Sequence, residues 1–331
     1  MRIYVVLLSA AMLMSCDFYQ DTFDQTVATY ISRIANIQDR PTVAVPQNKP
    51  VTLPNKRTLL IEIPAVNIGF LDSYELRKCG LFSLIAQRNS ILGKVQDHFR
   101  NYDYQITLTY GLNSCIESPY ISDELKSQLA DIQKIKQFQL PKHLSNLLFG
   151  SDAMRNQMQS SSYLTLQKSK ESTIVLDALK QIDMALLSSH NLDYSKMSVM
   201  LTPYQEVLDK NPVIGKLSYS MLNTTQKLQA VTKQLREYDE TIVCQTNRDR
   251  TQFNYLRNVF HEFFIEGIQP YLAQIDSTYN DLNPYLNFTE NGHAKYQYPI
   301  RTYHQAFREA SLAHVKYWQD LFTRCGVNPS P

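Results

Sequence analysis

Residues 214–242 read IGKLSYSMLNTTQKLQAVTKQLREYDETI, a stretch in which mostly apolar side chains recur at alternating steps of three and four. The repeating positions are Ile214, Leu217, Met221, Thr224, Leu228, Val231, Leu235, Tyr238 and Ile242. This heptad spacing places them all on one face of a helix, as in the seam of a coiled coil. The stretch therefore predicts a long helix that buries this face against neighbouring helices.

Amphipathic helical patterns also occur elsewhere in the chain. They cover residues 17–38, 81–99, 174–186, 253–267 and 300–321. We expect the fourth of these segments to end near Pro270, because proline interrupts helices. Heptad-like segments joined by connections of moderate length favour antiparallel neighbours. The predicted fold class is therefore all-α, a multi-helix bundle with long antiparallel helices, and a solenoid is the alternative.

Composition and charge exclude several classes of protein. The 331 residues include only 9 glycines, well below the usual share of roughly 7%. Few glycines leave little room for phosphate-cradling loops or for β architectures that are rich in turns. Lys and Arg together number 33 and Asp and Glu 31, so the net charge is only +2. Such a balance argues against a nucleic-acid partner, whose phosphates require a cationic surface.

Common catalytic and nucleotide-binding motifs are missing from the sequence. It contains no GxGxxG, no HExxH, no GxSxG and no GxxxxGK followed by Ser or Thr. Each of these motifs would place a phosphate, a zinc ion or a nucleophile by a known mechanism. The sequence therefore nominates no catalytic residue, no metal ligand and no cofactor.

Residues 41–66 have a different composition from the rest of the chain. They contain Pro41, Pro46, Pro50, Pro54 and Pro64 among many Val, Thr and Leu residues, a pattern that excludes a regular helix. We expect an extended, proline-rich strap along the surface of a single α-helical domain that spans residues 67–327. A flexible spacer is the alternative. Within the strap, residues 59–63 are the best candidate for a short strand.

The N-terminus carries the features of a lipoprotein signal peptide. The apolar run from Ile3 to Met14 is too short to span a membrane and fits the hydrophobic region of such a peptide. Leu13-Met14-Ser15-Cys16 resembles the bacterial lipobox, in which the cysteine is acylated before cleavage. We therefore predict a signal peptide at residues 1–15 and a lipid-anchored N-terminal helix at residues 16–40. A secreted protein with a coincidental cysteine is the alternative.

Lipidation at Cys16 would place the chain in the periplasm, with the membrane as a partner through the acyl chains. Asp17 follows the cysteine directly and resembles the signal that retains enteric lipoproteins in the inner membrane. The inner membrane is thus the favoured location, and the inner leaflet of the outer membrane is the alternative.

Four cysteines follow Cys16, namely Cys79, Cys115, Cys244 and Cys325. An even number in an oxidising compartment suggests two disulfides, for which three connectivities exist. Proximity along the chain favours Cys79 with Cys115 and Cys244 with Cys325, although spacing alone does not decide. None of the cysteines lies near a histidine at zinc-ligand spacing, so a metal site is not predicted.

Arg88 is the most unusual residue of the helical patterns. It falls in the centre of the apolar face formed by Leu81, Leu84, Ile85, Leu92, Val95 and Phe99. A guanidinium there loses water, which costs several kcal/mol unless acceptors receive its donors. Arg88, Asn89, Ser90 and Lys94 therefore form a candidate polar cluster for a ligand, such as an anionic head group. A buried ion pair that fixes helix register is the structural alternative, and Gly93 would allow another backbone to approach closely.

A resemblance to a known family rests on this part of the chain. The segment Cys79-Gly80-Leu81, followed by Leu84-Ile85-Ala86-Gln87-Arg88-Asn89-Ser90 and Leu92-Gly93-Lys94, resembles the central signature of the DUF3080 family, gammaproteobacterial lipoproteins of unknown function. Gln87 stands where the family tends to carry Glu, so the resemblance gives little support to an obligatory acidic partner for Arg88. It implies lipid anchoring and paired cysteines, and it implies no activity.

Two hypotheses about function follow from the sequence. The first is a lipid-anchored periplasmic helical protein with a non-enzymatic binding or scaffold role, whose partner is an envelope protein or a lipid. The second is a small-ligand binder or enzyme with an internal polar cavity around Arg88 and Asn89. The surroundings of Arg88 distinguish them, because a carboxylate partner would favour the first and an accessible cavity the second.

Overall fold

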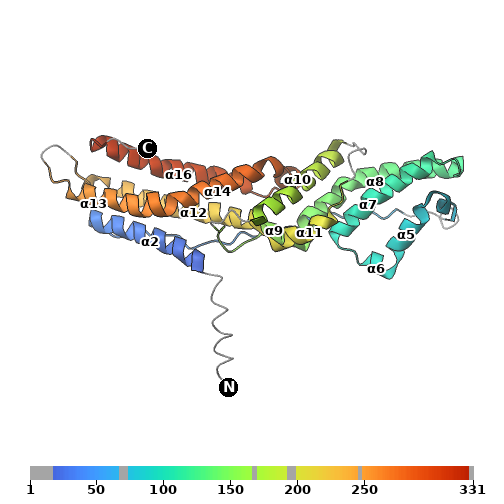
Figure 1. The fold of residues 1–331 in the computed structure, drawn as a ribbon, viewed down its shortest axis with the longest axis horizontal. Coiled ribbons are helices and arrows are strands. Elements are labelled where there is room, and N and C mark those ends of the chain that lie inside the picture. The colour runs from blue at the N-terminus through green and yellow to red at the C-terminus, as the bar shows by residue number, and fades with distance from the viewer. Residues whose placement is uncertain (1–17, 67–73, 166–169, 192–198, 245–247, 328–331) are drawn as a thin grey trace, which may run out of the picture.

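A computed structural model describes residues 18–66, 74–165, 170–191, 199–244 and 248–327. In these ranges the regular structure is helical, apart from one isolated bridge between Val51 and Ser160. The molecule is elongated, and most helices lie close to its long axis (Figure 1). The all-α, multi-helix prediction is confirmed. The strand expected at residues 59–63 is wrong, because Lys56–Leu59 forms a turn of helix and residues 60–66 have no regular structure.

The longer helices are α2 (Phe18–Gln38), α5 (Leu81–Asn89), α7 (His98–Glu117), α8 (Asp123–Gly150), α10 (Lys170–Asn191), α12 (Val213–Glu237), α13 (Thr251–Val259), α14 (Gln269–Leu282) and α16 (Ile300–Arg324), with the π-helix η6 (Phe260–Ile268) between α13 and α14. The shorter segments are α3 (Lys56–Leu59), η2 (Leu76–Cys79), α6 (Ile91–Lys94), α9 (Asp152–Met158), η4 (Thr202–Tyr204), α11 (Gln205–Lys210), η5 (Asp239–Thr241), η7 (Asn283–Tyr285) and α15 (Phe288–Asn291). Within the described ranges, none of the helices combines the length and the apolar character needed to cross a membrane.

Helix α12 contains most of the heptad seam. All seam positions from Ile214 to Leu235 are buried, as predicted. The helix ends at Glu237, however, and not at Ile242 as the pattern suggested. The chain turns at η5, where the Asp239 carboxylate accepts hydrogen bonds from Tyr317 and Arg324 of α16. Ile242 is buried after this turn, so its burial does not depend on the helix.

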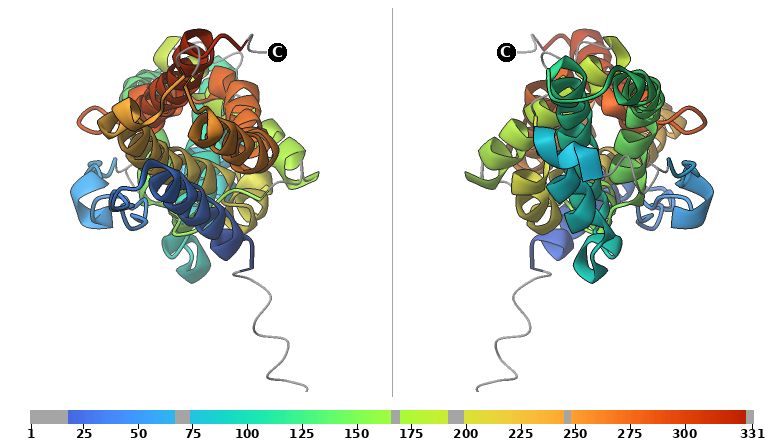
Figure 2. Two further views of the ribbon diagram at one scale, coloured as in Figure 1. Left: turned by 90° about the vertical axis from the view of Figure 1, so that its left-hand side faces the viewer. Right: turned by 90° about the vertical axis from the view of Figure 1, so that its right-hand side faces the viewer.

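Four helical columns meet in the half of the molecule that contains α12. Helices α2, α12 and α16 run in one direction, and α13, η6 and α14 return in the other (Figure 1; end-on in Figure 2, left). His314 lies at their junction. Its Nε2 accepts the indole N–H of Trp318 at 3.2 Å, and its Nδ1 donates to Thr232 Oγ1 of α12 at 3.0 Å. Burial lowers the pKa of His314 to about 3, so the ring is neutral at pH 7.

Pro270 does not end the fourth predicted segment, which continues as α14 to Leu282. The reason is the π-helix that precedes it, since the N–H of Gln269 reaches back five residues to the carbonyl of Phe264. Pro270 then falls in the first turn of α14, where its lack of an N–H costs little. The expectation that the helix ends near Pro270 is therefore wrong.

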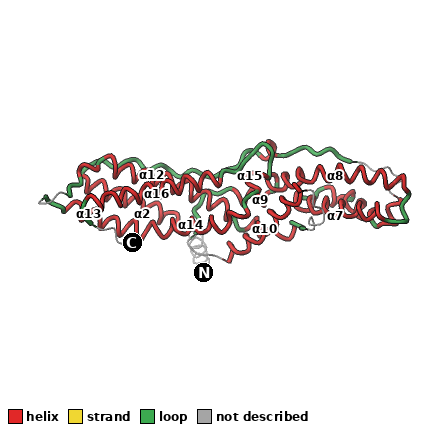
Figure 3. The backbone as a smooth tube through the Cα atoms, turned by 90° about the horizontal axis from the view of Figure 1, so that it is seen from above, coloured by secondary structure: helices red, strands yellow, loops and turns green. Residues whose placement is uncertain are grey.

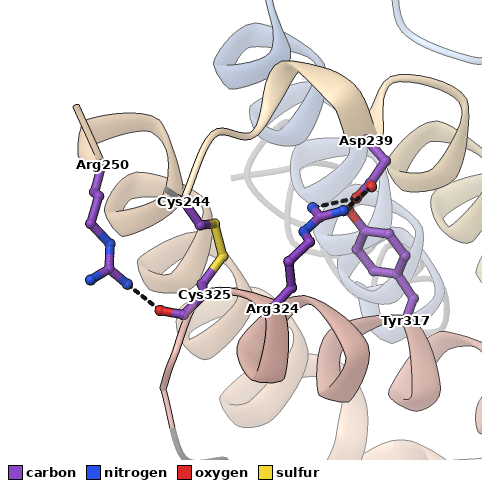
Figure 4. The surroundings of a disulfide bond; sticks show 6 residues. All are labelled: Asp239, Cys244, Arg250, Tyr317, Arg324 and Cys325. Atoms are coloured by element: carbon purple, nitrogen blue, oxygen red, sulfur yellow. Dashed lines mark hydrogen bonds and ion pairs between the residues drawn. A yellow bond between two sulfur atoms is a disulfide. The ribbon is translucent and has the colours of Figure 1, made fainter. Parts of the chain in front are cut away.

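The two disulfides follow the connectivity that chain proximity favoured. Cys79 at the end of η2 is bonded to Cys115 of α7, and Cys244 is bonded to Cys325 at the end of α16. Figure 4 shows the second bond, with the Arg250 guanidinium donating to the carbonyl of Cys325. The prediction of two disulfides is confirmed.

A second, smaller apolar core lies at the other end of the molecule. It is formed by η2, α5 and the facing parts of α7 and α8, which are antiparallel (Figure 1; end-on in Figure 2, right). Its buried residues are Leu76, Leu81, Leu108, Leu112, Cys115, Ile121, Leu125 and Leu129. The disulfide between Cys79 and Cys115 links two of the elements that enclose this core.

Amide side chains hold the segment 41–66 along the molecule, where it can be followed lengthwise past α12 and α8 in Figure 3. Asn223 of α12 accepts the backbone N–H of Lys49 at 2.7 Å and donates to its carbonyl at 3.0 Å. Asn146 of α8 pairs with Ile61 in the same way, at 2.7 and 2.8 Å. Gln234, Gln159 and Gln139 each make one further bond to the segment. These side chains replace the neighbouring strand that an extended backbone otherwise requires.

A buried ion pair joins α2 to α12. Lys227 is 6% exposed in its side chain, and its Nζ lies 3.3 Å from Asp24 Oδ1. The same carboxylate accepts the Tyr163 hydroxyl at 2.8 Å and the Asn48 amide at 2.6 Å. Burial, followed by the charge of Asp24, raises the pKa of Tyr163, so the phenol remains a donor. The sequence patterns do not reveal this network, because both helices carry other charged residues and the pairing depends on how α2 packs against α12.

Candidate functional site

Residues 81–99 form a bent corner and not the single helix that their spacing predicts. Helix α5 ends at Asn89, and Ser90 begins α6 by accepting the N–H of Gly93 on its hydroxyl at 3.1 Å. Leu92 and Val95 were expected on the buried face, but they are 81% and 76% exposed. The physical reason is that Ser90 offers the backbone a helix cap in the middle of the apolar pattern. Periodicity alone does not detect such a break.

Gly93 makes this corner possible. A Cβ atom at Gly93 would collide with the backbone carbonyls of Gln87 and Arg88 in α5. The expectation that Gly93 admits a close backbone neighbour is therefore confirmed, and the neighbour is the preceding helix itself. The tight corner turns the carbonyl of Gly93 toward the guanidinium of Arg88, which donates to it.

The guanidinium of Arg88 is bound by neutral acceptors. It donates to Gln96 Oε1 at 3.0 Å and to Asn101 Oδ1 at 3.1 Å, in addition to the Gly93 carbonyl. It also lies 5.5 Å from the ring centre of Tyr104, a cation–π arrangement. Within the described residues no carboxylate forms an ion pair with Arg88, which does not fit the buried ion-pair interpretation.

Arg88 lines a cavity of about 650 Å³ between α5, α7, α8 and residues 63–66. Two further bases, Lys136 and His143 of α8, line the same space. None of the described lining residues is Asp or Glu. Lys136 forms no ion pair within the described ranges, so the cavity wall carries an excess of positive charge.

Asn101 connects Arg88 to His143 and defines the proton position on the imidazole. Because its Oδ1 accepts from Arg88, its Nδ2 faces the ring and donates to His143 Nδ1 at 3.0 Å. Nδ1 is thus the acceptor, and the proton of the neutral ring lies on Nε2. Nε2–H is buried and has no partner among the described residues. His143 therefore presents a donor that nothing in this part of the chain satisfies.

The cavity makes the protonation of its own bases unfavourable. Burial, followed by the charges of Lys136, Arg88 and His98, lowers the pKa of His143 to about 4. Burial and the charge of Arg88 also lower the pKa of Lys136. An anion in the cavity would oppose both effects, because an opposite charge stabilises the protonated forms. The electrostatics of the site thus favour a negatively charged ligand.

Two acceptors in the cavity wall are also unpartnered. Gln105 and Gln139 are 5% and 4% exposed, and the Oε1 atom of each has no hydrogen-bond partner within the described chain. The Gln139 amide is oriented by its Nε2, which donates to the Pro64 carbonyl at 2.9 Å. A buried polar atom without a partner costs about 1–3 kcal/mol. With the Nε2 of His143, three buried polar atoms around one cavity lack a partner in the described chain, and a bound molecule would supply it.

A comparison with protein families covers this site and almost all of the chain. The family model described as "Protein of unknown function (DUF3080)" matches residues 27–329. The chain belongs to the DUF3080 family. Neither a curated protein nor a solved structure gives a match. The DUF3080 match includes every residue that lines the cavity, and its description names no activity.

In this DUF3080 chain the four residues of the predicted cluster have different positions. Arg88 and Asn89 line the cavity, whereas Ser90 caps α6 and Lys94 is exposed beyond the cavity wall. Cys16 and Asp17 lie outside the described residues.

Sequence reasoning missed the residues that α7 and α8 contribute to the site of this DUF3080 protein. Lys136, Gln139 and His143 are spaced by three and four on α8, and Asn101 and Gln105 by four on α7. Polar residues at these spacings form a polar stripe on each helix. The two polar stripes can be found in the sequence. Whether they face each other depends on how α7 and α8 pair, which the sequence pattern does not give.

Proposed function

We propose that this protein is a lipid-anchored component of the bacterial envelope that binds a small anion in the cavity around Arg88. One observation carries the binding role: Arg88, Lys136 and His143 line one cavity whose described lining includes no acidic residue. All three bases are half-buried, and gathering like charges in a partly desolvated space is unfavourable unless an opposite charge joins them. Arg88 is also suited to phosphate and carboxylate groups, which its planar donors match.

Replacing Arg88 with alanine is expected to weaken the binding of inorganic phosphate roughly 10- to 100-fold, since a hydrogen bond to a charged group contributes about 1.5–3 kcal/mol. Isothermal titration calorimetry and thermal unfolding with phosphate would measure this. Arg100→Ala is the matched control, because Arg100 is exposed on α7 and pairs with Asp97 at the surface.

Lys136→Met provides a second test that keeps the α5–α6 corner intact, since it removes the ammonium and leaves a chain of similar length. It should weaken phosphate binding by about tenfold or more, for the same reason. Equal phosphate affinity in the wild type, Arg88→Ala and Lys136→Met would contradict the proposed site.

The anchor is supported by the lipobox Leu13-Met14-Ser15-Cys16 and the preceding apolar run. Cys16→Ala should abolish fatty-acid labelling and leave the signal peptide attached, because cleavage follows acylation of this cysteine. Labelling with a fatty-acid analogue, the mass of the mature chain and membrane fractionation would measure these effects. Asp17→Ser is the control: it should keep the label and shift the protein from the inner toward the outer membrane. Unchanged labelling of Cys16→Ala would refute the anchor.

A scaffold role in the envelope is the second candidate, favoured by the apolar tip at α6. Ile91, Leu92 and Val95 are 87%, 81% and 76% exposed, and they are adjacent at the corner that Arg88 holds. Exposed apolar side chains in such a cluster are typical of an interaction surface.

A further inference from the structure

The cavity around Arg88 is polar at one end and apolar at the other. Helices α7 and α8 are antiparallel, and the contact between Asn101 and His143 marks their register at the polar end. A second contact, from Gln133 to Asn113, lies further toward the small core. Along both helices, therefore, the lining changes in the same direction, from Asn101 and His143 to Leu108 and Ile132, with Lys136 one turn before Ile132 on α8.

Helix α5 follows the same gradient. Its Arg88 end is bonded to Asn101, whereas Phe82 at the opposite end packs against the small apolar core. Ile85 lies between these two and also lines the cavity. From Asn101 to Leu108 the helix rises about 10 Å at 1.5 Å per residue. The cavity thus leads from a cluster of bases to an apolar path around Ile85, Leu108 and Ile132, whose far end lies about 10 Å from Asn101 along α7.

The unpartnered acceptors lie between the two ends. Gln105 is one helical turn beyond Asn101 on α7, and Gln139 is one turn beyond His143 on α8. Neither Oε1 atom has a donor within the described chain, and a hydroxyl group would supply one, whereas a fully ionised phosphate would not. The ligand should therefore carry a hydroxyl between its anionic group and its apolar part.

We infer that the cavity binds an anionic amphiphile with a hydroxyl group and one hydrocarbon chain, the chemistry of a monoacyl glycerol phosphate. This inference rests on the proposed function and specifies its ligand. The phosphate contacts Arg88, Lys136 and the Nε2–H of His143, and the hydroxyl donates to Gln105 or Gln139. The chain lies between Ile85, Leu108 and Ile132. A cavity of about 650 Å³ lies within the range of pockets that hold one small ligand.

Calorimetry with glycerol phosphate and with monoacyl glycerol phosphates of hexanoyl, octanoyl and decanoyl chains tests the inference. Each added pair of methylenes should raise the affinity by roughly tenfold until the apolar path is filled. Ile132→Asn should remove this dependence on chain length, because it places a polar amide in the apolar path. Ile135→Asn is the matched control, since Ile135 lies on the same helix, is 45% exposed and does not line the cavity.

The outcomes separate this inference from the proposed function. If phosphate compounds bind in a way that depends on Arg88 but their affinity does not change with chain length, the amphiphile inference is overturned and the proposed anion site is not. Failure of every probe, including inorganic phosphate, would overturn both. Flotation with phosphatidylcholine vesicles that contain the decanoyl compound shows whether the protein takes its ligand from a bilayer or from solution. Withdrawal of the lipid from the bilayer supports the inference, and so does capture of the free amphiphile only. If neither occurs, the inference is overturned.

Discussion

Replacing Asp24 with alanine is expected to lower the free energy of unfolding by about 3–5 kcal/mol, because it leaves Lys227 charged and unpaired in the core. The Lys227 side chain is 6% exposed and has Asp24 as its ion-pair partner at 3.3 Å. The variant also removes the acceptor of the Tyr163 hydroxyl and the Asn48 amide. Urea denaturation followed by circular dichroism would measure the loss.

Two further variants make the Asp24 result specific. Glu206→Ala removes an exposed pair with Lys210, so it should cost less than about 1 kcal/mol. Lys227→Met together with Asp24→Ala should recover much of the stability, since a buried ion pair replaced by apolar groups is often neutral. If Asp24→Ala costs no more than Glu206→Ala, the buried pair does not stabilise the fold.

Removing the disulfide between Cys244 and Cys325 by a double alanine substitution should cost about 4 kcal/mol. The bond closes a loop of 81 residues, and the constraint on the unfolded chain grows with loop length. Removing Cys79 and Cys115, which are 36 residues apart, should cost about 0.7 kcal/mol less, because the entropic cost of closing a loop falls as the loop becomes shorter. Thermal unfolding of both double variants would measure the difference.

Reduction of the wild type with dithiothreitol serves as the control for these cysteine variants. It should lower the stability of the wild type to about that of a protein lacking both bonds, and it should leave the quadruple alanine variant unchanged. A stability loss under about 1 kcal/mol for Cys244→Ala with Cys325→Ala would contradict the prediction. It would mean that the contacts of Asp239 with Tyr317 and Arg324 already hold this end together.

The success of the heptad pattern has a local cause. Side chains that recur at steps of three and four lie on one face of any helix, whichever partners cover that face. In α12 the positions from Ile214 to Leu235 are buried for this reason. The same rule misjudged residues 81–99, where the hydroxyl of Ser90 caps a new helix. The expectation that Pro270 ends a helix was wrong as well, because the π-helix before it places the proline in the first turn of α14. Capping and helix widening act over a few residues that periodicity averages out.

The binding site was only partly accessible to this reasoning. Arg88 was conspicuous because a charge fell within an apolar stripe, and Asn89 was next to it. Lys136 and His143 were not, since a base on a helix surface is usually solvated. Their meeting in one cavity depends on antiparallel pairing of α7 with α8 and on the Asn101 amide that joins Arg88 to His143.

The amino-acid sequence alone was sufficient to predict the helical class, the buried seam of α12 and the number of disulfides. Helix periodicity is read from residues a few positions apart, and the number of possible disulfides follows from the count of cysteines. The parallel course of α12 and α16 and the absence of acids from the described lining of the cavity required the folded molecule. Each of these depends on which surfaces, distant in the chain, exclude water together. That choice is made by the whole core and not by any one segment.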